Sequence, residues 1–355
     1  MSATGLALEN VSLRLGEFAL SDVSFAAARG EILVLLGANG AGKSVCLETI
    51  AGFHRPAQGR VLISGADVTG LSPERRRVAF LVQDFGLFPH LSIAENVAIG
   101  AEVRLSGSAL DALIARFGIA HLAATRPEHL SPGEKQRAAL ARALASRPAA
   151  YLFDEPFAAL DAPTAESLGQ DLATFVRGTG APSVFVTHDR AEAMALADRV
   201  AVIEDGFIRQ HGPADQVFAR PASIDIARLI GVENLIEGEL SGEFGDGICI
   251  RVGSARLTAV RHGTRCSLQR RVILSIRAEH VHLMPADALT RENRLCATVV
   301  ALRRVGPLWR VTLDCGFPLI AYALPQTARA AALGPGARLG VEIEPDAIHL
   351  LPAAP

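Results

Sequence analysis

Short apolar runs alternate with longer amphipathic stretches from the start of the chain to about residue 231. The runs are rich in leucine and β-branched residues, and their length favours buried strands. The stretches between them, such as residues 43–51, 135–146 and 190–197, have the length of helices. We therefore expect an α/β domain with a mostly parallel sheet. Its strands are expected at residues 31–36, 78–82, 150–153, 183–186 and 200–204.

The pattern changes after Pro221. A helix-like stretch at residues 222–230 leads into short segments with period-two alternation, separated by Gly, Pro and charged turns. Such alternation is typical of a small β-barrel or sandwich. The pattern predicts an α/β domain over residues 1–235 and a smaller β-rich domain over residues 236–355. Strands of the second domain are expected at residues 247–252, 272–276, 296–302, 309–313 and 339–343.

Composition agrees with two globular domains. The chain has 355 residues, and half of them are hydrophobic. A chain of this length is longer than a single domain with one hydrophobic core usually is. Its formal net charge of −2 argues against the diffuse attraction of a non-specific nucleic-acid binder, so no nucleic-acid partner is expected. The five cysteines form no CxxC pair, which indicates a reducing compartment. We expect no signal peptide, and no apolar run is long enough to span a bilayer.

A glycine-rich loop follows the first expected strand. It fits the pattern G-x-x-x-x-G-K-[ST] and precedes an expected helix, as that motif requires. Backbone N–H groups of such a loop converge on phosphate oxygens, and the N-terminus of the following helix adds positive potential. Lys43 would reach the β- and γ-phosphates, and the Ser44 hydroxyl would bind Mg²⁺. The residues of the loop are Gly37, Ala38, Asn39, Gly40, Ala41, Gly42, Lys43 and Ser44.

Two carboxylates follow the expected strand at residues 150–153. Asp154 is suited to hold Mg²⁺ through water, and Glu155 is placed to orient and deprotonate an attacking water. An apolar run before Asp-Glu is a weak signal by itself, because a solvated strand end gives the same pattern. Beside the glycine-rich loop it predicts a nucleoside triphosphatase.

Further motifs resemble those of ABC-type ATPases. Residues 130–137 (LSPGEKQR) resemble the family's signature motif, and they precede the paired carboxylates by some twenty residues as in that family. Gln83 follows an expected strand as the Q-loop glutamine does, and His188 follows another as the switch histidine does. Residues 159–161 (ALD) match the D-loop. The resemblance covers residues 1–231 and implies an α/β P-loop ATPase domain that uses ATP and Mg²⁺.

The resemblance also implies the roles of these residues. ABC ATPases bind ATP between two head-to-tail subunits, which implies a homodimer. The metal would be held by Ser44, Gln83 and Asp154. The expected catalytic residues are Glu155, His188, Gln83 and Lys43. The residues expected to contact ATP bound to the partner copy are Ser131, Pro132, Gly133, Glu134 and Asp161.

Three residues depart from the family pattern. Pro132 stands where signature motifs usually carry glycine, and it removes a backbone donor, although proline fits the first turn of a helix. Val45 stands where many members have a threonine that helps hold the α-phosphate. Leu15 stands where an aromatic residue usually stacks on adenine, and Phe18 is the candidate substitute. Leu15 and Val45 are still expected to contact ATP, and we expect a working ATPase of lower nucleotide affinity.

The chain lacks features of other ABC classes. The interval between Gln83 and Leu130 is too short for the coiled coil of repair and chromosome ATPases, and translation-type members carry two cassettes rather than one. Residues 83–100 resemble import ATPases. A loop folded on its own core is the alternative to a membrane-subunit contact in this segment. The apolar surface expected to meet a coupling helix consists of Phe85, Leu87, Phe88 and Leu91.

The β-rich domain resembles the OB-like accessory domain of importers. Residues 314–322 and 347–351 look most like the molybdate/tungstate branch. The resemblance implies a peripheral protein at the cytoplasmic face of the cell membrane, beneath two membrane-spanning permease subunits. A periplasmic or extracellular substrate-binding protein would act indirectly. It also implies oxyanion binding by the β-rich domain, with a dimer-stabilising spacer as the alternative.

Two other functions stay open from the sequence. The same ATPase domain would also suit an importer of ferric iron, polyamine or sulfate. A function of another class is a catalytically weak, non-transport regulator, in which the altered signature motif has abolished turnover.

Overall fold

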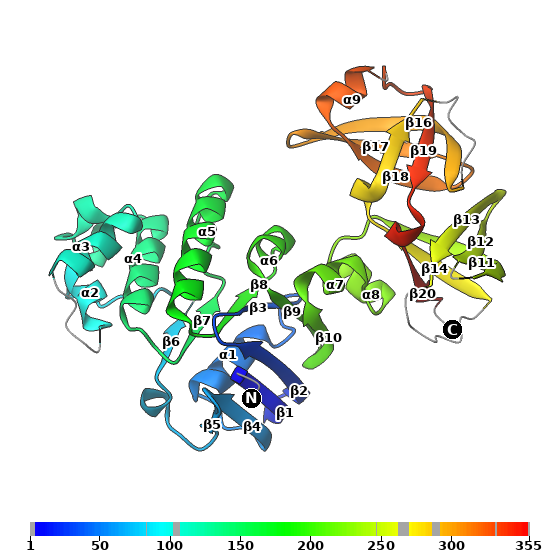
Figure 1. Ribbon diagram of the computed structural model, residues 1–355. Coiled ribbons are helices and arrows are strands. Elements are labelled where there is room, and N and C mark those ends of the chain that lie inside the picture. The colour runs from blue at the N-terminus through cyan, green and yellow to red at the C-terminus, as the bar shows by residue number, and fades with distance from the viewer. Residues whose placement is uncertain are drawn as a thin grey trace. The chain divides into compact units, whose positions relative to one another are not determined.

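The computed structural model describes residues 4–82, 84–101, 107–245, 247–261, 270–285, 292–330 and 332–353. The chain divides into two compact units, Met1–Val217 (unit 1) and Phe218–Pro355 (unit 2) (Figure 1). Helix α7 (Ala214–Ala219) spans this division, and helix α8 (Ile224–Leu229) follows it. The expected boundary at residue 235 lies beyond α8. The division in packing lies close to Pro221, after which the hydrophobic pattern changes.

The described part of unit 1 is built on a six-stranded sheet in the order β10-β9-β3-β8-β7-β6. Neighbouring strands are parallel, except that β10 runs antiparallel to β9. Strands β3, β7 and β8 are buried along their whole length, as strands inside a covered parallel sheet are. The mostly parallel sheet is thus confirmed. Its strands are β3 (Ile32–Leu36), β6 (Val78–Leu81), β7 (Ala150–Asp154), β8 (Ser183–Thr187), β9 (Arg199–Glu204) and β10 (Phe207–Pro213).

An antiparallel sheet, in the order β2-β1-β4-β5, was not predicted from the sequence. Register shifts interrupt the β1–β2 pairing around Val11, and such bulges break the period-two pattern that would have revealed the strands. Residues of this sheet, such as Leu8 and Val23, share one core cluster with Leu33 and Val184 of the central sheet. The strands are β1 (Thr4–Leu15), β2 (Phe18–Ala28), β4 (Gln58–Ile63) and β5 (Ala66–Asp67).

Helices connect the strands of unit 1. The structure confirms the helices expected at residues 43–51, 135–146 and 190–197, whereas the long α5 was not predicted. Helices α2, α3 and α4 gather at one end of the unit (Figure 1). Over the residues described, no helix combines the length and the apolar character needed to cross a membrane. The helices are α1 (Lys43–Ala51), α2 (Ile93–Ile99), α3 (Gly107–Arg116), α4 (Pro132–Ala145), α5 (Ala162–Thr179) and α6 (Arg190–Leu196).

The described part of unit 2 consists mainly of two antiparallel sheets that share one hydrophobic core. The expected all-β accessory domain is confirmed, with one short helix, α9 (Pro325–Ala330), among its strands. The first sheet has the order β13-β12-β11-β14-β20 and the second the order β15-β19-β16-β17-β18. The strands are β11 (Asn234–Phe244), β12 (Gly247–Val252), β13 (Ala255–Val260), β14 (Arg271–Ile276), β15 (Val281–Met284), β16 (Arg294–Val305), β17 (Leu308–Asp314), β18 (Pro318–Ala323), β19 (Arg338–Ile343) and β20 (Ile348–Pro352).

A buried asparagine joins the two sheets of unit 2. The Asn234 amide donates to the carbonyl oxygens of Ile276 in β14, at 3.2 Å, and of Ile320 in β18, at 3.0 Å. Its side-chain oxygen accepts the N–H of Ile320 at 2.6 Å. Asn234 is only 3% exposed, so water does not compete for these bonds.

We expect Asn234→Ala to destabilise unit 2 by about 2 kcal/mol or more, because it leaves buried polar groups without partners. The measurement is the urea midpoint followed by fluorescence of Trp309, the single tryptophan, which lies in β17. Asn10→Ala, in β1 of unit 1, is the matched control and should leave the Trp309 transition in place. Equal midpoints for the two variants would contradict the role of Asn234.

Candidate functional site

The glycine-rich loop turns between β3 and α1. Gly42 caps α1 in the left-handed region, with φ of 105°. A Cβ at Gly42 would lie 2.6 Å from the ring of Phe18, so the position requires glycine. A Cβ at Gly37 would lie 2.4 Å from the carbonyl oxygen of Ile203. The mouth of the loop is open to solvent, since its exposed residues are Ala38, Asn39 and Gly40.

The ammonium group of Lys43 lies buried within this loop. Its Nζ donates hydrogen bonds to the carbonyl oxygens of Gly37 and Ala38, each at 2.9 Å. Burial lowers the pKa of Lys43, and the nearby charges of Glu155 and Asp154 oppose that shift. The loop therefore holds a cation close to the two carboxylates that follow β7.

Ser44 and Asp154 come together at the start of α1 and the end of β7. Burial raises the pKa of the Asp154 carboxyl, while the nearby Ser44 hydroxyl and the charge of Lys43 work against that rise. A hydroxyl and a carboxylate fit Mg²⁺, which takes oxygen ligands and keeps several waters. The described residues contain no cluster of three or more His, Cys, Asp or Glu side chains able to hold a metal.

Glu155 and His188 meet because their strands are neighbours. Asp154 at the end of β7 pairs with Val186 in β8, so the residues that follow the two strands lie side by side. His188 Nδ1 lies 3.0 Å from Glu155 Oε1. The Glu155 side chain is 18% exposed, and that of His188 is 57% exposed. Glu155 also adopts φ of 48°, in the left-handed region that residues with a Cβ rarely enter.

The signature motif forms the start of α4. Ser131 caps the helix, with its hydroxyl accepting the N–H of Glu134 at 3.3 Å. The Glu134 carboxylate accepts the N–H of Ser131 at 2.8 Å and its hydroxyl at 2.7 Å. These bonds lower the pKa of Glu134. Pro132 occupies the first helical position, where no intrahelical N–H bond is needed, so α4 forms despite this departure.

The D-loop lies against the signature motif. A Cβ at Gly133 would lie 3.1 Å from the side chain of Leu160. Asp161 caps α5 by accepting the N–H of Thr164 at 3.1 Å and its hydroxyl at 2.9 Å, which lowers the pKa of Asp161. The hydrogen bonds of these signature and D-loop side chains are local to the two helix starts. The structure thus brings the two motifs together with each other, and not with the loop at residues 37–44.

Two of the other expected ATP contacts are apolar residues packed on the core. Leu15 faces Phe18 across the β1–β2 turn, and both are partly buried. The ring that lies against the glycine-rich loop is that of Phe18, at Gly42. Val45 is also partly buried against the same core. Gln83, the expected Q-loop residue, lies outside the described residues.

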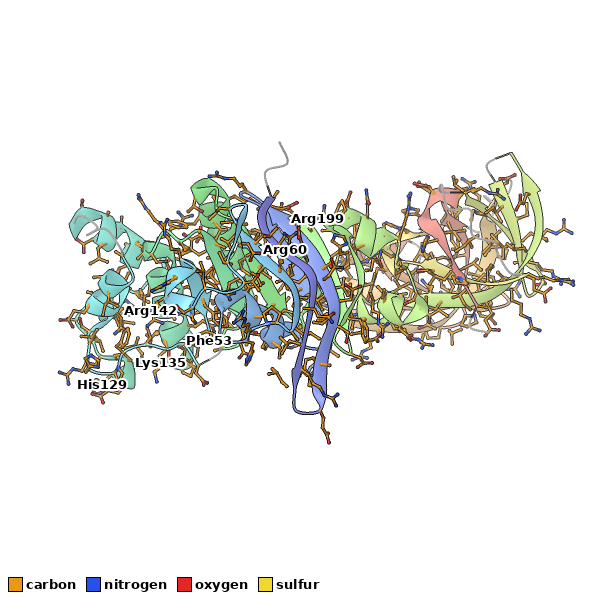
Figure 2. The ribbon with its side chains drawn as sticks, turned by 90° about the horizontal axis from the view of Figure 1, so that it is seen from below. Phe53, Arg60, His129, Lys135, Arg142 and Arg199 are labelled. Atoms are coloured by element: carbon orange, nitrogen blue, oxygen red, sulfur yellow. The ribbon has the colours of Figure 1, made fainter. Side chains whose placement is uncertain are left out.

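Sequence reasoning missed two residues of α4. Gln136 hydrogen-bonds the main chain of Glu155 and of Ala159. Arg142, labelled on α4 in Figure 2, donates to the carbonyl oxygens of Phe85, at 2.9 Å, and Gly86, at 2.6 Å. Its guanidinium lies 5.6 Å from the centre of the Phe88 ring. No sequence pattern indicated these contacts, because the partners are 19 to 57 positions away.

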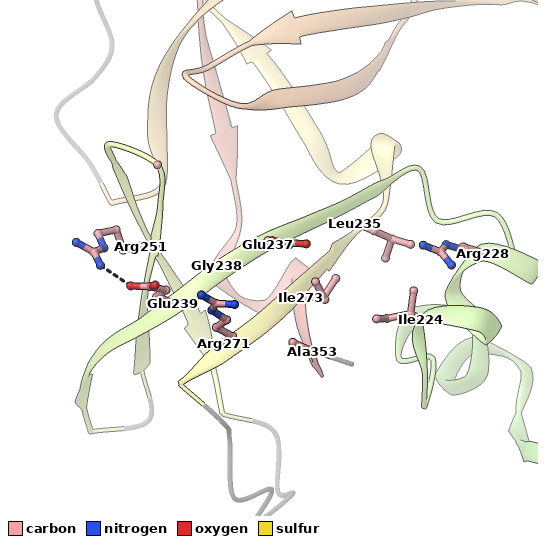
Figure 3. A pocket seen from close by; sticks show the side chains of 11 residues that line it. Ile224, Arg228, Leu235, Glu237, Gly238, Glu239, Arg251, Arg271, Ile273 and Ala353 are labelled. Atoms are coloured by element: carbon pink, nitrogen blue, oxygen red, sulfur yellow. Dashed lines mark hydrogen bonds and ion pairs between the residues drawn. The ribbon is translucent and has the colours of Figure 1, made fainter. Parts of the chain in front are cut away.

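Unit 2 contains a groove of about 730 Å³ along β11, β14 and α8 (Figure 3). Glu239 lies between two arginines, since it is opposite Arg251 in β12 and Arg271 in β14. Arg251 forms an ion pair with Glu239 and lowers the pKa of that carboxyl. The Arg271 side chain makes no hydrogen bond or ion pair with any residue that the structure describes, and its charge also lowers the pKa of Glu239. The charged side chains of the groove are Arg228, Glu237, Glu239, Arg251 and Arg271.

The fold of unit 1 and the arrangement of these motifs define the ATP-binding cassette of ABC transporters. The ABC transporter family model matches residues 20–158, and the TOBE domain model matches residues 274–351. A dimeric post-hydrolysis state of the cassette MJ0796, bound to ADP and Pi, superimposes with a TM-score of 0.52 and 30% identity. That match covers 59% of this chain and 98% of the cassette.

Relatives extend the similarity over both units. A molybdate/tungstate import ATP-binding protein, WtpC of Pyrococcus abyssi, is 37% identical over 88% of this chain and 89% of its own length. The spermidine/putrescine protein PotA 1 of Pseudomonas aeruginosa is 37% identical over 92% and 90%. The sulfate/thiosulfate protein CysA of Caulobacter vibrioides is 40% identical over 67% and 73%. This chain belongs to the ABC transporter family, among its import ATP-binding proteins.

Proposed function

We propose that this chain is the ATP-hydrolysing subunit of a molybdate or tungstate importer. The observation that carries hydrolysis is the Glu155–His188 pair, held 3.0 Å apart beside the buried Asp154 and Lys43. Without these groups, the family resemblance would fit equally well a protein that binds ATP but does not hydrolyse it. A carboxylate paired with an imidazole supplies the base that hydrolysis needs.

The base and its partner have distinct tasks. Glu155 would orient and deprotonate the attacking water, because its carboxylate is partly exposed at the end of β7. Its hydrogen bond to Nδ1 orients the His188 ring, which would stabilise the γ-phosphate and the attacking water.

The phosphates and the metal have separate ligands. Lys43 and the backbone N–H groups of residues 37–44 would bind the phosphates. Ser44, Asp154 and Gln83 would hold Mg²⁺, which neutralises phosphate charge when it is bound. The Ser44 hydroxyl lies near enough to the Asp154 carboxyl to lower its pKa, so the two supply oxygen ligands of the required kind.

A second copy of the chain would complete the site. Ser131 and Pro132 are exposed at the start of α4, where the helix N-terminus carries partial positive charge. This end would face the nucleotide held by residues 37–44 of the partner copy, together with Gly133, Glu134 and Asp161. The dimeric state of the similar cassette MJ0796 supports this arrangement.

Two membrane-spanning subunits are the proposed partners at the loop after β6. Phe88 is 41% exposed and Val82 is 36% exposed, whereas the expected contacts Phe85, Leu87 and Leu91 are partly buried. These apolar side chains lie close in sequence to Gln83, which would link them to the metal. In this arrangement the chain would lie on the cytoplasmic face of the membrane. A substrate-binding protein on the other side would act only indirectly.

The cargo is proposed from similarity over both units. The WtpC match spans most of both chains, which supports molybdate or tungstate. The polyamine and sulfate import proteins have a sequence identity to this chain comparable to that of WtpC. Polyamine, sulfate and ferric iron are therefore the alternative cargoes for the same ATPase. The non-transport regulator is the alternative of another class.

Glu155→Gln is expected to lower ATP turnover by about 100-fold or more, because the general base is lost while the side-chain shape is kept. ATP binding should persist, so size-exclusion chromatography with Mg²⁺ and ATP should show a stable dimer of this variant. If the parent protein shows no ATP turnover even with its membrane subunits, while the Pro132→Gly variant does, the result would support the non-transport regulator and contradict the role of a transport ATPase.

Phe88→Glu is expected to abolish co-purification of membrane subunits co-expressed with the tagged chain, because it places a charge in the apolar surface. Phe207→Glu is the matched control. Phe207 is a phenylalanine of similar exposure, at 42%, and also has an arginine, Arg209, over its ring. Retention of the membrane subunits by the Phe88 variant would exclude this docking surface.

We further propose that the Arg271 end of the groove in unit 2 binds the oxyanion (Figure 3). Calorimetry of the full chain should show binding of molybdate and tungstate. Arg271→Gln should weaken it by about tenfold or more, the worth of one charge-assisted hydrogen bond. Arg329→Gln in α9 is the control. If neither anion produces a heat of binding, the proposal that the chain binds an oxyanion is wrong. If the Arg271 variant binds the anion with unchanged affinity, the proposed location of the site is wrong. Equal binding of sulfate would favour the sulfate alternative.

A further inference from the structure

We propose that Gln136 is a positioning residue that links the signature helix α4 to the general base. Its Nε2 donates a hydrogen bond to the carbonyl oxygen of Glu155 at 3.3 Å. Its Oε1 accepts one from the N–H of Ala159 at 3.2 Å. The side chain is 3% exposed, so water does not replace either bond. The inference rests on the role proposed above for Glu155.

The main chain of Glu155 is held on both of its polar sides. Its N–H donates to the carbonyl oxygen of Val186 in β8 at 3.0 Å. Its carbonyl oxygen accepts from Gln136 and from the N–H of Ala158, the latter at 3.3 Å. Glu155 has φ of 48°, a conformation that costs free energy and persists where the surroundings hold it. Gln136 therefore helps to hold the backbone turn that aims the catalytic carboxylate.

The same amide holds the chain that leads into the D-loop. Ala159 precedes Leu160, whose side chain lies against Gly133 of the signature motif. Gln136 thus ties α4 to the base of its own site and to the segment that ends at Asp161. In a helix, Gln136 is about 6 Å along the axis from the first residue of α4. A movement of the exposed helix start against a partner's nucleotide would reach the Glu155 backbone through this side chain.

If Gln136 has only a packing role, its substitution should change different properties of the protein than if it has a positioning role. A glutamine that only fills space between a helix and a loop would affect stability. A positioning residue would affect turnover while ATP binding stays intact, because the groups that bind the phosphates are on β3 and α1 and do not touch Gln136. The tests therefore separate kcat from nucleotide affinity, and both from the melting temperature.

Gln136→Leu removes both hydrogen bonds with little change in size. We expect kcat for ATP to fall about tenfold or more, since small displacements of a catalytic group cost rates of this order. Binding of a fluorescent ATP analogue should change by less than twofold. Hydrogen–deuterium exchange of the peptide covering residues 155–161 should accelerate as the Ala159 N–H loses its acceptor. Gln136→Glu keeps the acceptor for Ala159 but not the donor for Glu155, so it should lose kcat with slower exchange than the leucine variant.

Leu140→Val is the control, because Leu140 lies one turn further along α4, is fully buried and has no polar side-chain atom to hold the main chain. It should lower the melting temperature and leave kcat unchanged. Equal loss of kcat in Leu140→Val and Gln136→Leu would overturn the inference, as would unchanged exchange at residues 155–161. If the parent protein shows no turnover even with its membrane subunits, the proposed function fails. The exchange of residues 155–161 then still decides whether Gln136 holds this segment.

Discussion

The nucleotide site depends on the parallel pairing of β3, β8 and β7. Parallel strands place their carboxyl ends at one edge of the sheet, so the segments that follow them meet there. Lys43, Glu155 and His188 come close for this reason, although more than a hundred residues separate the first from the second. All three strands are buried along their length, so side chains on both of their faces pack into the interior of unit 1. The core of unit 1 therefore holds the site in place.

Helix α4 connects three regions with different proposed tasks. Its start, at Ser131, is exposed where a second copy would bind. In its middle, Gln136 holds the main chain of Glu155, and near its end Arg142 holds the loop of Phe85 and stacks on Phe88. A helix of 14 residues is stiff over this distance, so movement at one contact reaches the others. The physical route from membrane partner to catalytic base would thus run along one element.

ATP hydrolysis and the choice of the transported substrate would depend on different parts of the molecule. The groups proposed to bind and hydrolyse ATP are all in unit 1. Relatives whose names give different cargoes, WtpC and PotA 1, accordingly match this chain over about nine tenths of its length. Fold alone does not specify the ligand of a binding domain. In unit 2 the relevant observation is electrostatic, because Arg251 forms an ion pair with Glu239 while Arg271 acts on Glu239 only through its charge.

The sequence by itself determined the central strands, the glycine-rich loop, Asp154, Glu155 and the all-β character of the second unit. These signals are local: the length of an apolar run, period-two alternation, or glycine at fixed spacing. Only the tertiary structure decided the β1–β2 sheet, whose bulges interrupt its alternation, and the left-handed backbone of Glu155. It also decided the partners of Gln136, Arg142 and Asn234. Their amides and guanidinium bond to main-chain groups far away in sequence, and such groups leave no side-chain pattern from which the pairing can be predicted.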